Sequence, residues 1–290
     1  MDWTVASGQG LVVRVSDSSE TEVFPAFYAG YDRAFVLPDE KEERAGFVEC
    51  LALNHGPVFE RVSARFGAFR ELVLAAEVDG VAVGGANVIV TPLPAWSVVT
   101  VHLNYVYVLP EARGRGLLRR LVDACRDVAS ALFPGVGPVV VFLELNDPSR
   151  LTAEQYASDS AASGVDQFDR IAIWARLGLR VVDFPYVQPP LSKAQEADDK
   201  LLLGVLADPA FRLPGALLGD HLERFFAISV LKTGTIESNL AASEQVSRCR
   251  EIPEVALVDP VPHLDALRKE SGAQRKGFRE RLVELTRARG

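Results

Sequence analysis

Along the first part of the chain, segments with apolar residues at helical spacing alternate with short apolar segments typical of strands. Apolar residues at helical spacing predict helices at about residues 20–35, 39–53, 57–66, 116–132 and 166–177. Short β-rich or continuous apolar runs predict strands at about residues 11–15, 70–78, 81–91, 97–108, 138–143, 179–184 and 200–207. The chain is therefore expected to begin with a domain that mixes helices and strands.

Glycine-containing stretches predict how some of these elements connect. Val78-Asp-Gly-Val81 is typical of a β-hairpin, because Asp-Gly tolerates the positive φ angles of a tight turn. Gly84 and Gly85, inside the next strand, indicate a bulge or a close approach of another backbone segment. Residues 146–164 are polar and are expected to form a loop with one short helix.

After Asp208-Pro209 the pattern becomes helical. Apolar spacing predicts helices at about residues 214–231, 237–250 and 263–289. We therefore expect a main domain over residues 1–207 and a helical C-terminal extension over residues 208–290. The extension is a candidate cover for a substrate site and a candidate contact of a homodimer.

Composition indicates a globular protein. Of the 290 residues, 48% are hydrophobic and 24% are charged, and no apolar run approaches the ~18–20 residues that a membrane-spanning helix needs. Residues 1–4 lack the basic start and apolar stretch of a secretory signal. Cys50, Cys125 and Cys249 are widely spaced, without CxxC or Cys/His metal spacing. We expect reduced thiols, a cytoplasmic location, no metal and no membrane association.

The net charge of −8 argues against a nucleic-acid partner, because phosphates are neutralised by a basic surface. Residues 263–290 depart from this balance, since basic residues outnumber acidic ones there. A basic helix that binds a partner and the solvated face of a terminal helix both fit this segment.

Residues 101–121 carry the strongest functional pattern, a strand followed by a glycine-rich turn and a helix. The first N–H groups of such a helix have no backbone partner, and they point the same way. The helix dipole adds partial positive charge, so the junction suits a phosphate. Gly114 and Gly116 allow a sharp turn and a close approach of the ligand, while Arg113 and Arg115 supply charge.

Residue types exclude two other phosphate-binding motifs. A Walker loop needs Gly-Lys-Ser/Thr after its glycines, whereas Leu117-Leu118 follow here. A dinucleotide-binding fingerprint needs a third glycine, which this turn lacks.

The segment Val108-Leu-Pro-Glu-Ala-Arg-Gly-Arg-Gly-Leu-Leu-Arg-Arg-Leu121 resembles the acyl-CoA-binding motif of the GCN5-related N-acetyltransferases (GNAT), whose core is Pro-x-x-Arg-Gly-x-Gly. The sixth position, usually Gly or Ala in the family, is Leu118 here. Residues 168–180 are similar to the family's helix that ends in Tyr-x-x-Leu-Gly-Phe. The order of elements up to about residue 207 also resembles the family's domain.

The resemblance implies a GNAT-like acyl-CoA N-acyltransferase fold of the α/β class, with a central mixed, mostly antiparallel sheet flanked by helices. It implies acetyl-CoA or another acyl-CoA as co-substrate, with the pyrophosphate held by main-chain amides of the turn. Asn146 resembles an asparagine that contacts the pantetheine arm. The implied cofactor-binding residues are Val106, Tyr107, Val108, Arg113, Gly114, Arg115, Gly116, Leu117, Leu118 and Asn146.

His102 and Glu144 are candidates for proton transfer. His102 lies on the strand before the turn, and a neutral imidazole is a suitable base near pH 7. The alternative interpretation is a hydrogen-bonded histidine that packs beneath the sheet. Glu144 ends an apolar strand, where a carboxylate is costly unless it has a partner or a purpose, so it is a candidate to line the acceptor site.

The general acid of the family is a tyrosine on the second motif's helix, and Trp174 stands at this position. An indole cannot donate a useful proton. Tyr186 is a substitute by residue type, as are Tyr105 and Tyr107, and release of the thiolate to solvent is an equal alternative.

Two functions follow from the resemblance. The first is an enzyme that transfers acetyl from acetyl-CoA to an amine by direct attack, with a small-molecule amine or a peptide as acceptor. The second is a non-catalytic module of the same fold that senses acyl-CoA, which the missing tyrosine allows. The acceptor and the acyl length cannot be inferred from one sequence.

Overall fold

The computed structural model describes residues 2–7, 10–37, 41–190, 196–270 and 276–288. Its contacts group the chain into two compact units. The first comprises residues 1–141 and 224–235, and the second comprises residues 142–223 and 236–290. The boundary expected near residue 208 stays a prediction.

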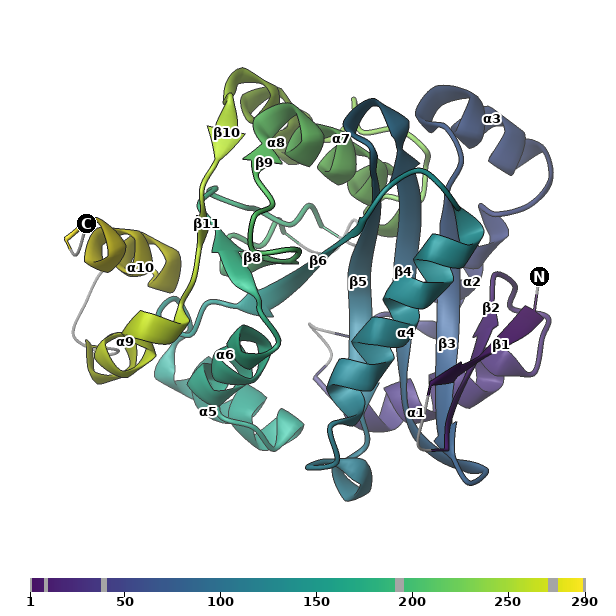
Figure 1. Ribbon diagram of the computed structural model, residues 1–290, viewed down its shortest axis with the longest axis horizontal. Coiled ribbons are helices and arrows are strands. Elements are labelled where there is room, and N and C mark those ends of the chain that lie inside the picture. Colours follow the sequence, from purple (N-terminus) through teal and green to yellow (C-terminus); the bar gives the residue numbers. More distant parts are fainter. Residues whose placement is uncertain (1, 8–9, 38–40, 191–195, 271–275, 289–290) are drawn as a thin grey trace. The chain divides into compact units, whose positions relative to one another are not determined.

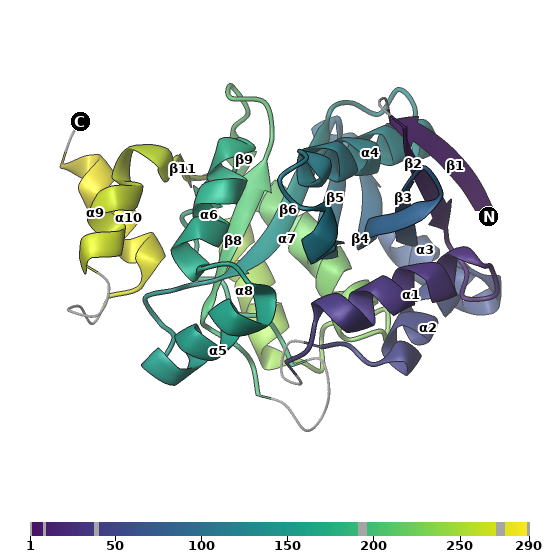
Figure 2. The ribbon, with the colours of Figure 1, turned by 90° about the horizontal axis from the view of Figure 1, so that it is seen from below.

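The first unit contains five strands in the order β1-β2-β3-β4-β5, each antiparallel to its neighbours. They are β1 (Asp2–Ser7), β2 (Leu11–Ser16), β3 (Arg70–Val78), β4 (Val81–Leu93) and β5 (Val98–Val108). Helices α1 (Val23–Ala34), α2 (Arg44–Ala52) and α3 (Gly56–Phe66) precede β3, and α4 (Leu117–Leu132) follows β5. Figure 2 shows α4 on one face of these strands and α1 and α2 on the other.

Large apolar side chains hold α1 and α2 against the strands. Phe27 of α1 packs edge-on against Phe47 of α2, with the ring centroids 5.4 Å apart. Tyr107 of β5 reaches the same cluster, and its hydroxyl donates a hydrogen bond of 2.7 Å to the carbonyl oxygen of Phe27. Burying side chains of this size stabilises the unit by about 1.5–3 kcal/mol for each aromatic.

The predicted hairpin and the glycine pair are both confirmed. Asp79 and Gly80 connect β3 and β4 with φ angles of 52° and 74°. The register of this pair shifts beside Gly84, which is the expected bulge. A Cβ on Gly84 would lie 2.5 Å from the main-chain carbonyl oxygen of Tyr107, so the close approach of another backbone segment is present as well.

The second unit contains strands in the order β6-β8-β7-β11. They are β6 (Val139–Asn146), which begins in the first unit, β7 (Arg180–Val182), β8 (Leu201–Leu206) and β11 (Leu257–Val258). A separate short pair joins β9 (Leu213–Pro214) to β10 (Glu254–Val255). The helices, visible in Figure 1, are α5 (Ala153–Ser163), α6 (Gln167–Arg176), α7 (Gly215–Phe225), α8 (Leu240–Glu251), α9 (Leu264–Glu270) and α10 (Phe278–Arg287).

The predicted fold class is confirmed, because helices flank a mixed, mostly antiparallel sheet. Strand β1 was not predicted, and the short helix expected within residues 146–164 is the 11-residue α5. The helix predicted for residues 263–289 is two helices, α9 and α10. Residues 39–40, 271–275 and 289 of the predicted helices lie outside the described residues. None of the helices in the described part of the chain is long and apolar enough to cross a membrane.

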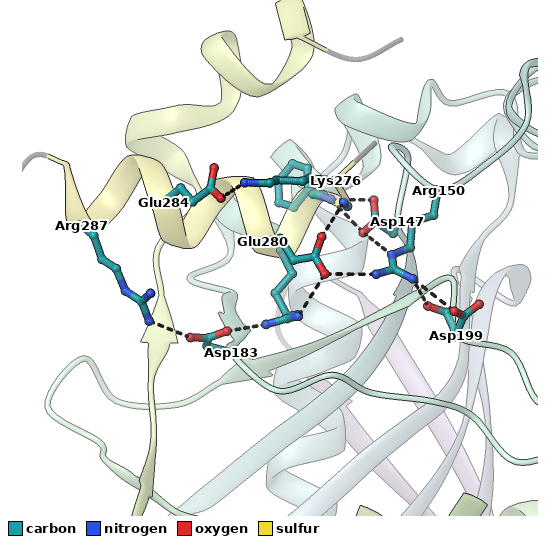
Figure 3. A network of polar contacts seen from close by, with 11 residues as sticks. Asp147, Arg150, Asp183, Asp199, Lys276, Glu280, Glu284 and Arg287 are labelled. Atoms are coloured by element: carbon teal, nitrogen blue, oxygen red, sulfur yellow. Dashed lines mark hydrogen bonds and ion pairs between the residues drawn. The ribbon is translucent and has the colours of Figure 1, made fainter. Parts of the chain in front are cut away.

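The C-terminal helix α10 is attached to the end of β6 by a buried carboxylate (Figure 3). Asp147, only 2% exposed, accepts the Phe278 N–H at 2.9 Å and so caps the first turn of α10. Arg150 bridges Asp199 at 3.2 Å and Glu280 at 3.3 Å on the surface beside it. The ion pairs of Arg279 with Asp183 and of Lys276 with Glu284 support the interpretation of this basic segment as a solvated face.

Replacing the buried cap should cost much more stability than replacing the exposed carboxylate of the same network. We expect Asp147→Ala to lower the free energy of unfolding by about 1–3 kcal/mol, because it leaves a buried N–H without its acceptor. Asp199→Ala, the matched control on an exposed ion pair, should cost less than about 1 kcal/mol. Urea unfolding of the full chain measures both, and equal losses would contradict the cap.

Candidate functional site

The glycine-rich turn lies between two buried anchors in the first unit. Strand β5 ends at Val108, and a 3₁₀ turn, η3 (Pro110–Ala112), leads into the turn. Ala112 before it and Leu117 after it are 3% and 4% exposed. The four residues between them are exposed to solvent. The turn is thus fixed at both ends while its main chain remains accessible.

Both glycines of the turn adopt left-handed backbone angles. The φ angle is 75° at Gly114 and 70° at Gly116, which is the N-cap of α4. A Cβ on either would meet nothing within 4 Å. The glycines are therefore needed for the backbone conformation and not for internal packing, and the space beside them is open to a ligand.

The start of α4 has the character of an anion site. None of the described side chains caps this helix, and no acidic residue lies in its first turn. The N–H groups of Leu117 and Leu118 precede the first possible helical hydrogen bond, so they are available to phosphate oxygens. Arg113 ties the turn to β5, since its Nε donates to the carbonyl oxygen of Val108 at 3.2 Å.

The last residues of β5, which the resemblance implies to bind the cofactor, differ in their surroundings from the residues of the turn. The ring of Tyr107 is buried against α1, and burial raises its pKa, so its phenol serves the core. Val106 and Val108 are half-buried on the same strand. Any contact of Tyr107 with a cofactor would have to come from its main chain.

His102 is packed in the interior of the first unit. It is 0% exposed, and its ring stacks on that of Phe225 with centroids 3.5 Å apart. Burial lowers its pKa to about 3. An imidazole with so low a pKa is a weak base, so this geometry favours the packed alternative over proton transfer.

Glu144 belongs to the second unit and lies half-buried near the end of β6. One carboxylate oxygen accepts a hydrogen bond from the hydroxyl of Tyr186. The other accepts from the Nε2 of Gln188 at 3.2 Å. Two donors from one short segment thus hold the carboxylate.

The environment of Glu144 gives it a pKa suited to proton transfer. Burial raises the pKa to about 7, although the hydrogen bond from Tyr186 acts in the opposite direction. Burial and the adjacent carboxylate raise the pKa of Tyr186 well above its ordinary value. Glu144 therefore exchanges protons near neutral pH, whereas Tyr186 keeps its proton.

Two further residues singled out from the sequence lie in the second unit. The side-chain amide of Asn146 donates a hydrogen bond to Asp159 of α5 at 2.8 Å. The side chain that is expected to contact pantetheine is therefore already bonded to helix α5. Trp174 is buried in α6, at 5% exposure. The described residues contain no group of three or more His, Cys, Asp or Glu side chains arranged to hold a metal ion.

Sequence reasoning missed a buried carboxyl in the first unit. Glu71 is 0% exposed, and its Oε1 accepts hydrogen bonds of 2.8 Å from both Asn87 and Asn104. Its Oε2 accepts from Ser229 at 2.8 Å, and Ser229 lies in a π-helical turn, η4 (Phe226–Val230). Burial raises the pKa of Glu71 to about 7. The sequence feature that could have indicated this carboxyl is the presence of polar residues inside otherwise apolar strands.

The Glu71 network stabilises an irregularity in β5. The β4–β5 register shifts so that Asn87 faces Tyr105 and Val88 faces Leu103, which leaves Asn104 as an extra residue. The amide of Asn104 also donates to the Oδ1 of Asn87 at 2.9 Å. Because Glu71 is fully buried, we assign it to holding this bulge and not to contact with a substrate.

Part of the chain matches a known protein family. Residues 53–156 match the family model described as "Acetyltransferase (GNAT) family". The matched segment includes β5, the glycine-rich turn and Glu144, so the resemblance found in the sequence is confirmed there. A comparison with curated protein sequences found no match.

Solved structures of acetyltransferases are similar to the chain. The ribosomal-protein-S18-alanine N-acetyltransferase from Escherichia coli is 20% identical, with a TM-score of 0.37, over 69% of this chain and 98% of that one. Naa50 from Arabidopsis thaliana, in complex with a bisubstrate analogue CoA-Ac-MVNAL, is 12% identical, with a TM-score of 0.38, over 68% and 99%. An acyl-CoA N-acyltransferase from Pseudomonas aeruginosa is 15% identical, with a TM-score of 0.37, over 68% and 99%. Likeness at this level says nothing about the acceptor of this chain.

The raised pKa of Glu71 predicts how stability depends on pH. Its pKa in the folded chain, about 7, exceeds the ordinary value of 4.5, so its contribution to stability is largest at acidic pH and is lost as the pH rises through 7. Glu71→Gln keeps the shape and an acceptor for both asparagines. We expect the loss of stability between about pH 5 and pH 8 to shrink by about 2–3 kcal/mol in this variant, measured by urea unfolding. An unchanged pH dependence would exclude a raised pKa at Glu71.

Proposed function

We propose that the chain is an acyl-CoA-dependent N-acyltransferase that transfers acetyl from acetyl-CoA to a primary amine. The observation that carries this proposal is the turn Arg113–Leu118, where two glycines with positive φ angles lead into the uncapped start of α4. Such a turn directs several amide N–H groups at one point. The match to an acetyltransferase family over the same residues supports acetyl-CoA as the ligand.

In this proposal, the amides of Leu117 and Leu118 bind the pyrophosphate of acetyl-CoA. Arg113 and Arg115 add positive charge beside it, and Asn146 is proposed to contact the pantetheine arm after leaving Asp159. A dipole-oriented amide site suits a diphosphate, because it neutralises charge without a bulky side chain between donor and ligand.

The chemical step that we propose uses Glu144 as the base. The neutral amine attacks the thioester carbonyl, the C–N bond forms, and the C–S bond breaks. Glu144 takes the proton that the nitrogen loses, and the CoA thiolate takes a proton from solvent. The pKa of Glu144, raised to about 7 by burial, supports this role, because a base works best when its pKa lies near the working pH.

Tyr186 is proposed to orient the Glu144 carboxylate. Its pKa is raised well above 10, so it does not lose its proton readily, and its hydroxyl donates to Glu144 throughout. This favours release of the thiolate to solvent over protonation by a tyrosine. His102, with a pKa of about 3, has no part in the proposed step.

A non-catalytic acyl-CoA sensor is the second candidate function. Trp174, which stands where the family has its tyrosine acid, is the observation in its favour. A small-molecule amine or a peptide is the proposed acceptor, and the net charge of −8 favours a cationic one. A cytoplasmic location and a homodimer both remain predictions.

Loss of the left-handed turn should weaken cofactor binding. In Gly116→Val the backbone angle is strained by about 1–2 kcal/mol and a side chain enters the ligand space, so we expect the Kd for CoA to rise at least about tenfold. Gly135→Val is a matched control, because Gly135 has a φ of 77° and open space around its Cβ but lies outside the turn. Calorimetric titration with CoA measures both, and equal affinities would contradict the proposed site.

Removal of the Glu144 carboxylate should remove the inflection near pH 7 from the pH profile of turnover. For the native chain, kcat/KM should show this inflection, because Glu144 ionises there, in addition to the rise at higher pH that deprotonation of the acceptor amine causes. Glu144→Gln should lower kcat by about 100-fold or more and remove this inflection. Release of free CoA thiol with a panel of amines measures the rate of turnover at each pH.

Glu71→Gln, which alters another carboxyl with a pKa of about 7, is the control and should retain the inflection. Thiol release that persists in Glu144→Gln would assign the base elsewhere.

A further inference from the structure

Helix α8, in the predicted C-terminal extension, contacts the segment that holds Glu144 through one buried glutamine. Gln245 is 2% exposed, and its Oε1 accepts the N–H of Val187 at 2.8 Å. Its Nε2 donates to the carbonyl oxygen of Val187 at 2.6 Å and to that of Ala241, within α8, at 2.9 Å. Both main-chain polar groups of one residue, Val187, are therefore satisfied by a single side chain.

Val187 stands between the two residues that hold Glu144. Tyr186 donates to one carboxylate oxygen, and Gln188 donates to the other. The main chain of Gln188 is fixed as well, since it exchanges hydrogen bonds of 2.8 and 2.9 Å with Asp198. Because alternate side chains of an extended segment point to the same side, the position of Val187 sets the direction of both its neighbours.

The chemistry of a side-chain amide suits this task. A primary amide carries a donor and an acceptor in one plane, so it can pair with the main-chain N–H and C=O of one residue as a neighbouring strand would. Residues 186–188 lie outside β7 and β8, and the side chain of Gln245 makes the two hydrogen bonds to Val187 that a neighbouring strand would otherwise make. These groups are partly buried, so leaving them without partners would cost at most about 1–3 kcal/mol each, which explains why the segment needs such a contact.

We infer that Gln245 is a positioning residue for the Glu144 base: it fixes Val187, and through Val187 it fixes the two hydrogen bonds that Tyr186 and Gln188 donate to the carboxylate. Part of the predicted C-terminal extension thereby belongs to the reaction machinery. The inference deepens the proposed function and rests on it for its catalytic consequence.

The physical consequence concerns the proton affinity of Glu144. The hydrogen bond from Tyr186 lowers the pKa of this carboxyl against the effect of burial. If Val187 is released, Tyr186 and Gln188 hold the carboxylate less well, and its pKa rises. A purely structural role of Gln245 would lower stability and leave the titration of Glu144 where it was.

The test uses the full-length chain with Gln245→Met, which keeps the side-chain length and removes both bonds to Val187. Gln245→Glu is the second variant, because it retains the acceptor for the Val187 N–H and loses the donor. Glu244→Gln, on the exposed side of α8, is the control. Side-chain carboxyl NMR of glutamate-labelled protein, assigned with Glu144→Gln, follows the titration without requiring activity.

We expect the titration midpoint of Glu144 to rise by about half a pH unit or more in Gln245→Met and less in Gln245→Glu. Where amine acetylation is measurable, kcat at pH 7 should fall about two- to threefold and its inflection should move by the same interval, with KM for acetyl-CoA unchanged. Glu244→Gln should change neither quantity.

A folded variant at Gln245 with an unmoved Glu144 titration would overturn the positioning role, whether or not the chain is an enzyme. A moved titration in a chain that acetylates no amine would retain the positioning role and overturn the proposed function. Thermal unfolding of each variant establishes that the comparison is made between folded proteins.

Discussion

A short bend of main chain, carrying positive φ angles at two glycines, is the constraint on which the functional account depends. It leads into the start of α4, whose amide hydrogens lack side-chain caps from the described residues. Buried Ala112 and Leu117 anchor the bend, so its shape does not have to be formed by the ligand. A preformed anion site loses less conformational entropy on binding than a flexible loop would.

Local pattern was sufficient for much of the fold. The hairpin at Asp79-Gly80 and the bulge beside Gly84 depend on local backbone preferences, and both were predictable. Strand β1 was missed because its few apolar residues form no clear period, and it is defined by its antiparallel pairing with β2. The break between α9 and α10 was missed for a related reason, since Asp147, far away in sequence, caps the first turn of α10.

The candidate site was predictable from the sequence where its chemistry follows from adjacent residues, and not where it follows from packing. The glycine turn could be located from spacing alone, and Glu144 from its position at the end of an apolar strand. The hydrogen bond from Gln188 to Glu144 and the contact of Gln245 with Val187 could not be predicted, because these residues come together only in the folded chain. The same holds for His102, whose burial against Phe225 gives it a pKa far too low for the task that its residue type suggested.

The most direct measurement of the central claim compares the binding of acetyl-CoA and S-acetylpantetheine to the full chain by calorimetry. The two ligands share the thioester, but only the first carries the pyrophosphate. If the amides of α4 bind that group, acetyl-CoA should bind at least about a hundredfold more tightly, a difference of about 2.7 kcal/mol. Equal affinities, or no binding of acetyl-CoA, would contradict the account.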